Sequence, residues 1–270
     1  MKLLINGCSF TGGSEVIHDP ETSLITNNGQ TTWANHFEED FETNNVAVGG
    51  NSNDKIFRRT VEELNKESYD YAIIQWTAIH RKERYSDMRQ TWINFCQTES
   101  FTTNNQFFET ASDSNKRDLY GYHTDNHADM DRDNPKLSSV LKSYDKIRDG
   151  LVYDVFYGKT LQDFRVEYFK NVLSLQNILD KKNIKYIFTS MSFENHIPNI
   201  KSNWSFDRNI AITEFEQDLL DQMDLSVWTK NPMTHMMNQN KVSQNDGHPN
   251  EIGHKLIYNH VQKELNKIYG

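Results

Sequence analysis

Cysteine and basic residues are both scarce in this sequence. Cys8 and Cys96 are the only cysteines among 270 residues, and two cysteines at this spacing form neither a disulfide framework nor a recognisable zinc motif. No apolar run approaches the ~20 residues of a membrane helix. The 29 Lys and Arg residues are outnumbered by 38 Asp and Glu residues, which gives a formal net charge of -9. We therefore expect neither a membrane nor a nucleic-acid partner, while the oligomeric state stays open.

Targeting and cofactor signals are also missing. The amino terminus has neither the long apolar core nor the cleavage site of a secretory signal, so we expect a cytoplasmic or otherwise intracellular location. The stretch NGCSFTGGS lacks the G-x-G-x-x-G spacing, and no Gly-Lys-Ser/Thr phosphate loop is present. The acidic run HTDNHADMDRDN lacks the glycine and the final acid of a calcium loop. We therefore expect no cofactor and no metal.

The sequence does contain short apolar runs that alternate with helical patterns. Strands are predicted at residues 2–6, 44–48, 71–77 and 184–191, with a weaker fifth at 225–228. Helices are predicted after Thr31-Thr32 with Trp33, Phe37 and Phe41 on one face, after Ser52, at 159–182 and at 250–269. This alternation predicts parallel strands with helices on both faces. The fold class is therefore α/β, a three-layer αβα sandwich with a sheet of about five strands.

Residues 81–150 interrupt this alternation. They are rich in Asn, Asp, Ser and Thr, show no evident strand, and are expected to be partly helical around 91–96. We interpret residues 1–270 as a single domain with a polar insertion after the third strand. A lid over a site is one interpretation of the insertion, and a disordered or partner-binding excursion is the other.

Three residues follow the ends of predicted strands: Ser9, Gly50 and Thr77. The carboxyl ends of parallel strands meet at one edge of a sheet, where ligands collect, so we expect these residues to lie together. Near the other end of the chain, Asp246 and His248 occupy a turn before the last helix. A histidine with a carboxylate beside it is a general base for a hydroxyl nucleophile, and Ser9 is the candidate nucleophile. The backbone N–H groups of Ser9 and Gly50 are candidates for an oxyanion hole.

Three stretches, NGCSF, VAVGGNSND and DGHPN, together resemble the motifs of the SGNH (GDSL-type) hydrolases in the same chain order. The resemblance implies a flavodoxin-like sandwich and ester hydrolysis by a serine near the amino terminus. By position it implies that Ser9 is the nucleophile, that Gly50 donates a backbone N–H, and that Asp246 and His248 complete a catalytic triad.

The sequence departs from that family at three places. Cys8 replaces the usual aspartate before the serine, and Asn245, not Asp246, stands three residues before His248. No asparagine follows the third strand, where the residues are Trp76-Thr77-Ala78-Ile79. The third oxyanion donor is therefore left open among Asn51, Asn53 and the Thr77 hydroxyl.

The expected function is that of a serine esterase acting on a small-molecule or carbohydrate ester, with O-acetyl groups on a carbohydrate as the leading substrate. Two alternatives stay open. One is a non-catalytic SGNH-like domain that binds a ligand or a partner. The other is acyl transfer on the same triad, if the insertion excludes water from the acyl-enzyme.

Overall fold

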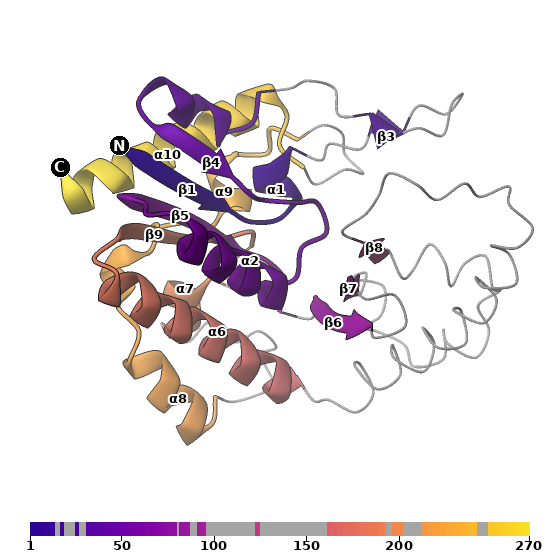
Figure 1. Ribbon diagram of the computed structural model, residues 1–270, viewed down its shortest axis with the longest axis vertical. Helices are drawn as coiled ribbons and strands as arrows, with labels where there is room; N and C mark the ends of the chain where they lie inside the picture. The colour runs from indigo at the N-terminus through magenta and orange to yellow at the C-terminus, as the bar shows by residue number, and fades with distance from the viewer. Residues whose placement is uncertain are drawn as a thin grey trace, which may run out of the picture.

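A parallel sheet forms the centre of the protein (Figure 1). The computed structural model describes residues 1–13, 17–18, 25–26, 31–79, 81–86, 91–95, 122–124, 161–192, 196–201, 212–241 and 248–270. In these residues the sheet has four strands in the order β4-β1-β5-β9, and every pairing is parallel. The strands are β1 (Lys2–Asn6), β4 (Glu42–Asn45), β5 (Tyr71–Trp76) and β9 (Lys185–Ser190).

The strand order fixes where a ligand can approach. The second strand along the chain, β4, lies on one side of β1, and the third, β5, lies on the other. The chain therefore reverses its direction of winding at β1, as in flavodoxin-like sheets, and sheets of this topology bind ligands outside the carboxyl ends of the strands at that point. The residues that follow β1 and β5 are consequently neighbours at the sheet edge.

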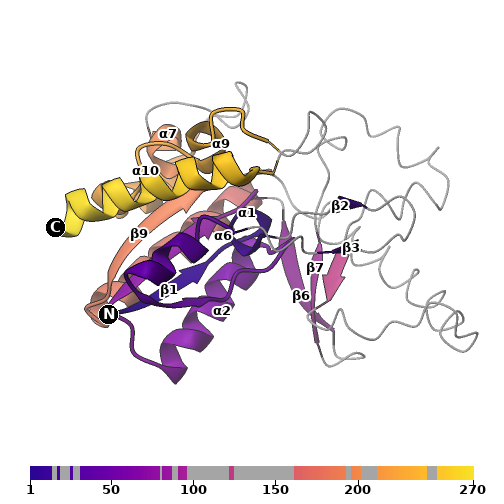
Figure 2. The same cartoon turned by 90° about the horizontal axis from the view of Figure 1, so that it is seen from above.

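Helices cover both faces of the sheet, which confirms the three-layer sandwich. One face packs against α2 (Asn53–Lys66), α6 (Leu161–Lys181), α7 (Ile197–Lys201) and α8 (Glu214–Asp221). The opposite face packs against the 3-10 helix η1 (Asn35–Glu39), α9 (Met233–Met236) and α10 (Glu251–Tyr269). Figure 2 shows α10 and α2 on opposite sides of the sheet. Alternation along β1 explains the division, because Leu4 faces one helical layer while Leu3 and Ile5 face the other.

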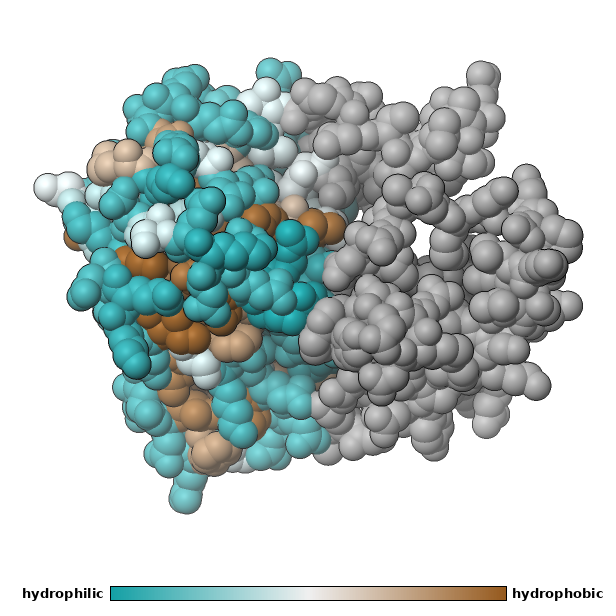
Figure 3. Space-filling view, in the orientation of Figure 1, coloured by the Kyte–Doolittle hydropathy of each residue, from teal (hydrophilic) through white to brown (hydrophobic). Residues whose placement is uncertain are grey.

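The predicted helix starts at Ser52 and Asn250 are confirmed by their capping bonds. The Ser52 side chain accepts a hydrogen bond from the Lys55 N–H and starts α2, and the Asn250 side chain accepts one from the Gly253 N–H and starts α10. The surface over α2 and α6 is hydrophilic with apolar patches between (Figure 3), and partly buried Phe57, Val61, Val166 and Leu173 belong to this layer. Across the described ranges, no helix combines the length and hydropathy needed to span a bilayer.

The helix predicted after Thr31-Thr32 is wrong in type, because the structure has only the short η1 there. The Thr32 hydroxyl donates to the Asn35 side-chain oxygen, 2.8 Å away, and the N-cap position of η1 is Ala34, which has no side-chain capping bond. The aromatic residues that the pattern placed on one face are nevertheless buried at Trp33 and Phe37, which have no exposed surface. A 3-10 segment is thus sufficient to bring both rings into the layer below α10.

Two strand predictions also need correction. The second strand lies at β4, two residues earlier than expected, because Val46 to Val48 lead into the Gly49-Gly50 turn. Residues 225–228 form no strand but the 3-10 helix η5 (Leu225–Val227), and only Trp228 makes an isolated parallel bridge, to Phe188. Asp224 is the physical reason, since its side chain accepts the Ser226 N–H and starts a turn. The described sheet therefore has four strands where about five were expected.

The insertion contains a second sheet, which the sequence interpretation missed. The strands β6 (Lys82–Ser86), β7 (Thr91–Phe95) and β8 (Tyr122–Thr124) pair antiparallel in that order. The helix expected around 91–96 is therefore wrong: Thr, Trp, Ile and Phe favour an extended chain, and β7 finds partners on both sides. Two short strands, β2 (Ile17–His18) and β3 (Ile25–Thr26), pair separately. The remainder of 81–150, and with it the lid prediction, lies outside the described residues.

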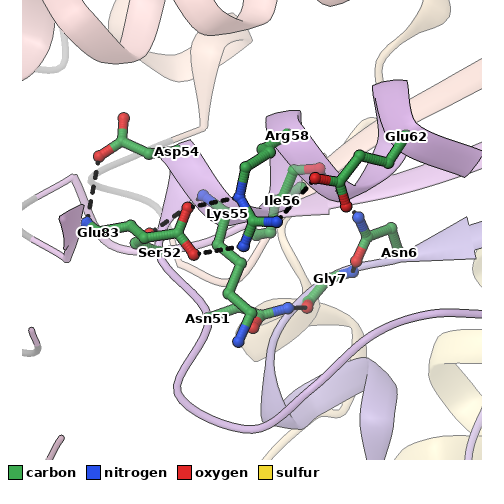
Figure 4. A network of polar contacts seen from close by, with 10 residues as sticks. All are labelled: Asn6, Gly7, Asn51, Ser52, Asp54, Lys55, Ile56, Arg58, Glu62 and Glu83. Carbon is green, nitrogen blue, oxygen red and sulfur yellow. Dashed lines mark hydrogen bonds and ion pairs between the residues drawn. The ribbon is translucent and has the colours of Figure 1, made fainter. Parts of the chain in front are cut away.

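Ion pairs attach the start of the second sheet to the helical layer. Arg58 of α2 donates two hydrogen bonds to the carboxylate of Glu83 at 3.0 and 2.7 Å, as Figure 4 shows. Lys82 pairs with Glu167 of α6. Because the Glu83 side chain is only 1% exposed, this bidentate contact is stronger than a surface pair. The β6 strand is thus held to the sandwich beside the carboxyl end of β5.

Candidate active site

Ser9 and His248 lie in hydrogen-bond contact at the carboxyl edge of the sheet. The Ser9 Oγ is 2.7 Å from the His248 Nε2, although 239 positions separate the two residues in the chain. Ser9 opens the short helix α1 (Ser9–Gly12) directly after β1, and His248 precedes α10. Ser9 is 8% exposed, and the imidazole is half-buried. The serine hydroxyl donates to the imidazole when that ring carries its proton on Nδ1.

The turn after β1 is built to present Ser9. Cys8 precedes α1 in an extended conformation, and its carbonyl accepts the N–H groups of Thr11 and Gly12. Gly13 closes the helix with a φ of 67°, a left-handed conformation that favours glycine. The Cys8 side chain is fully buried in the apolar cluster that contains Leu3 and Ile5. Cys8 therefore packs into the core, and Ser9 is the residue that reaches the histidine.

Gly50 lies in a tight turn that is tied to the turn of Ser9. The Asn51 N–H donates to the Val48 carbonyl, and Gly50 has a φ of 72°, which this turn requires at its third position. The Asn51 side-chain amide donates to the Gly7 carbonyl at 2.7 Å, a contact visible in Figure 4. The two segments that carry the predicted backbone donors are thus joined by a buried hydrogen bond.

Asn53 and Thr77 contact each other. The Thr77 N–H donates to the Asn53 Oδ1 at 2.8 Å, and the Asn53 Nδ2 donates to the Thr77 carbonyl at 3.0 Å. The Thr77 hydroxyl lies 4.0 Å from the sulfur of Met191. These contacts connect the first turn of α2 to the segment after β5. They engage both atoms of the Asn53 amide, which the sequence had placed among the candidates for the third oxyanion donor.

Four buried amide side chains at this edge escaped the sequence interpretation as a group. Each makes a hydrogen bond to a helix, turn or strand end far away in sequence, and Asn and Gln are common enough that nothing local marks these four. They are Asn6, Asn51, Asn53 and Gln75.

An aromatic ring and a second histidine lie near His248. Phe10 packs on its imidazole. The Nδ1 of His254 accepts the main-chain N–H of Trp33 at 3.3 Å, and burial, followed by the electrostatic effect of nearby His248, lowers the pKa of His254 to about 4. His254 is therefore neutral at pH 7. Asp246 and Asn245, the two candidates for orienting His248, lie outside the described residues.

A second serine–histidine pair lies at the end of β9. The Ser190 Oγ is 2.9 Å from the His196 Nδ1, and the His196 Nε2 is 3.0 Å from the Thr229 carbonyl. Both side chains of the pair have no exposed surface, and burial lowers the pKa of His196 to about 4. This pair is closed to substrate and serves as an internal contact between β9 and the segments that follow it.

No three His, Cys, Asp or Glu side chains gather into a metal-binding cluster within the ranges that the structure describes. Most of the acidic run after His123 lies outside those ranges. At the carboxyl edge of the sheet, the described residues therefore provide a hydroxyl, an imidazole, amides and backbone N–H groups. That set is suited to nucleophilic attack on a carbonyl and to stabilising an oxyanion.

No family model and no curated protein matches the chain. Among solved structures it is similar to TesA, with 10% identity and a TM-score of 0.47 over 99% of each chain. It is also similar to the psychrotrophic esterase EstA from Pseudoalteromonas sp., with 9% identity and a TM-score of 0.44 over 98% of this chain and 97% of the other. LAE5, an alpha/beta hydrolase enzyme from the metagenome of Lake Arreo, Spain, has 12% identity and a TM-score of 0.44 over 100% and 96% of the two chains. At such identities, the reaction of this chain has to be argued from its own side chains.

Proposed function

We propose that this protein is a serine hydrolase that cleaves esters, with Ser9 as nucleophile and His248 as general base. The observation that carries the proposal is the 2.7 Å contact between the Ser9 Oγ and the His248 Nε2. A nucleophile and base within hydrogen-bond reach are the signature of covalent catalysis. The contact lies at the strand reversal beside β1, which is where sheets of this topology bind ligands.

In the proposed reaction, His248 removes the hydroxyl proton while the Ser9 Oγ attacks the ester carbonyl carbon. The carbonyl oxygen gains the negative charge and is stabilised by the N–H groups of Ser9 and Gly50. His248 then gives the proton to the leaving alcohol, and the acyl group stays on Ser9. His248 next removes a proton from a water molecule, whose oxygen attacks the acyl carbon, and His248 returns that proton to the Ser9 Oγ as the bond from the acyl group to Ser9 breaks and the carboxylic acid leaves. Asp246 is proposed to hold the imidazole in the required tautomer.

We further propose a short acyl group such as acetyl, carried by a carbohydrate alcohol. The limited exposure of Ser9, 8%, supports a small acyl group, because a bulky chain would have to displace the packed neighbours of the serine. The alcohol is identified by assay: acetylated sugars are compared with p-nitrophenyl esters of increasing acyl length, and the rate is expected to fall as the acyl chain lengthens.

The proposal is tested by fluorophosphonate labelling together with hydrolysis of p-nitrophenyl acetate. Ser9→Ala is expected to abolish both, because it removes the hydroxyl that lies 2.7 Å from the His248 Nε2. Ser190→Ala is the matched control, since Ser190 also contacts a histidine but is fully buried, and it is expected to label like the wild type. Cys8→Ala is expected to retain most activity.

Two results would overturn the proposal. One is labelling that survives Ser9→Ala or His248→Ala. The other is an unlabelled, inactive wild-type protein that is nevertheless folded, which would favour the non-catalytic binding domain.

A further inference from the structure

Beside the nucleophile turn lies the polar side chain of Gln75 in β5, which has no exposed surface. We infer that Gln75 is a positioning residue for Ser9: its carbonyl oxygen holds the turn that presents the hydroxyl to His248. The inference rests on the proposed function, and it adds a residue that neither the motifs nor the strand pattern indicates.

The Gln75 side chain forms hydrogen bonds to the turn on both sides of Ser9. Its Oε1 accepts the Cys8 N–H at 2.9 Å and the Thr11 hydroxyl at 3.0 Å. Its Nε2 donates to the Trp76 carbonyl at 2.7 Å. Because a carbonyl can only accept, the Trp76 contact fixes which end of the amide is the nitrogen, and the oxygen must face the turn. The orientation of the side chain is therefore determined by its own strand.

The glycine before Cys8 is explained by the same contact. A Cβ on Gly7 would lie 2.6 Å from the Gln75 Oε1 and 2.5 Å from the Thr11 hydroxyl oxygen, which is closer than these atoms can approach. Gly7 is not in a left-handed conformation, since the described glycines with positive φ are Gly13 and Gly50. The glycine of the NGCSF stretch is thus required by the approach of Gln75.

The location of Gln75 argues against a role in folding alone. The preceding residues Ala72, Ile73 and Ile74 are fully buried and apolar, and an apolar side chain at position 75 would avoid the cost of burying an amide. What an apolar residue cannot do is accept the Cys8 N–H, next to the nucleophile. Catalysis is sensitive to such support, because a displacement of ~1 Å can cost about 10²-fold in rate.

The test compares Gln75→Leu with a matched control, Gln176→Leu. Gln176 of α6 is also buried, and its side chain also accepts a backbone N–H, that of Asp224, at 3.0 Å. This hydrogen bond joins α6 to the segment after α8, away from the Ser9 turn. Gln75→Leu is expected to lower kcat for p-nitrophenyl acetate by about 10- to 100-fold with little change in KM. Gln176→Leu is expected to leave kcat at the wild-type value.

Gln75→Glu provides a readout that a purely structural role would not move. A glutamate side chain can accept the Cys8 N–H in either protonation state, but it can donate to the Trp76 carbonyl only when it is protonated. Burial favours this protonated form. The ratio of its kcat to that of the wild type is therefore expected to rise as the pH is lowered. A ratio that stays flat would count against positioning through these two hydrogen bonds.

A measurement that needs no activity separates this inference from the proposed function. In ¹⁵N-histidine NMR spectra, Gln75→Leu is expected to shift the Nε2 resonance of His248, because its contact with Ser9 is disturbed, whereas Gln176→Leu leaves it unchanged. An unchanged resonance together with an unchanged kcat would overturn the inference while Ser9-dependent labelling still upheld the hydrolase. Conversely, a shifted resonance in a protein without labelling would uphold the positioning role and reject the hydrolase.

Discussion

The ring of Phe10 packs against the imidazole of His248, with the ring centroids 5.3 Å apart and the planes inclined by 43°. Phe10 directly follows the nucleophile and is 5% exposed. The contact therefore restricts the imidazole from the side of α1. A ring pair of this kind contributes about 0.5–1.5 kcal/mol beyond the area that it buries.

Phe10→Leu is expected to lower kcat/KM by roughly three- to tenfold, since that energy no longer holds the imidazole in place. The free energy of unfolding should change by less than about 1.5 kcal/mol, because leucine keeps most of the volume. Phe41→Leu is the control, as Phe41 also packs on aromatic rings but not on His248. Equal rates for the two variants would contradict a role of Phe10 in orienting the base.

Asn53→Ala tests whether the Asn53 amide supports the loop after β5 or stabilises an oxyanion. The variant removes the two hydrogen bonds that join Asn53 to the Thr77 N–H and carbonyl, so urea unfolding should show a loss of about 1–3 kcal/mol. We expect kcat to fall by less than tenfold. A loss of about 10²–10³ in kcat at unchanged stability would instead identify Asn53 as the third oxyanion donor.

The residue that orients His248 is predicted to be Asp246, because a carboxylate stabilises the imidazolium form and an amide does not. Asp246→Asn should therefore reduce kcat by up to about 10⁴, while Asn245→Ala should have a small effect. The two variants are compared by burst kinetics and steady-state hydrolysis. If Asn245→Ala is crippling and Asp246→Asn costs less than tenfold, the orienter is the amide.

Stability is expected to decrease as the pH falls from about 6.5 to about 4. Burial lowers the pKa values of His196 and His254 to about 4, whereas unfolded histidines titrate near ~6.5. Between these values the unfolded chain binds protons that the folded chain does not, so the free energy of unfolding falls with falling pH, by up to about 3 kcal/mol per histidine. Urea unfolding at pH 7.5 to 4.5 measures this slope.

His196→Asn should make that slope shallower, whatever it does to stability at neutral pH. His260→Gln, an exposed position of α10, should leave the slope unchanged. A wild-type curve that is flat over this range would show that the folded and unfolded chains bind the same number of protons, and it would contradict the lowered pKa values of the two buried histidines.

Local patterns allowed the prediction of those features that depend on neighbouring residues. Apolar runs located β1, β5 and β9, and capping residues located the starts of α2 and α10. The pairing of Ser9 with His248 was predicted from a serine after the first strand, a histidine in the turn before the last helix, and the resemblance to the SGNH motifs. The contacts of Gln75 and Asn53 could not be predicted, because each amide bonds to backbone groups brought near by tertiary folding. The second sheet was missed for another reason: β6 and β7 are neighbours in the chain and the residues of β7 favour strands, but they lie within a polar segment that was interpreted as an insertion without strands.

The 239-residue separation between nucleophile and base also sets when the protein can become active during its synthesis. Ribosomes add about 5–20 residues per second, so roughly ten to fifty seconds pass between the emergence of the Ser9 turn and that of His248. Throughout this interval the nascent chain carries the serine without its base. In the proposed mechanism, a copy whose synthesis stops before α10 would carry the Ser9 turn without the imidazole that activates it, so incomplete chains would have no hydrolytic activity.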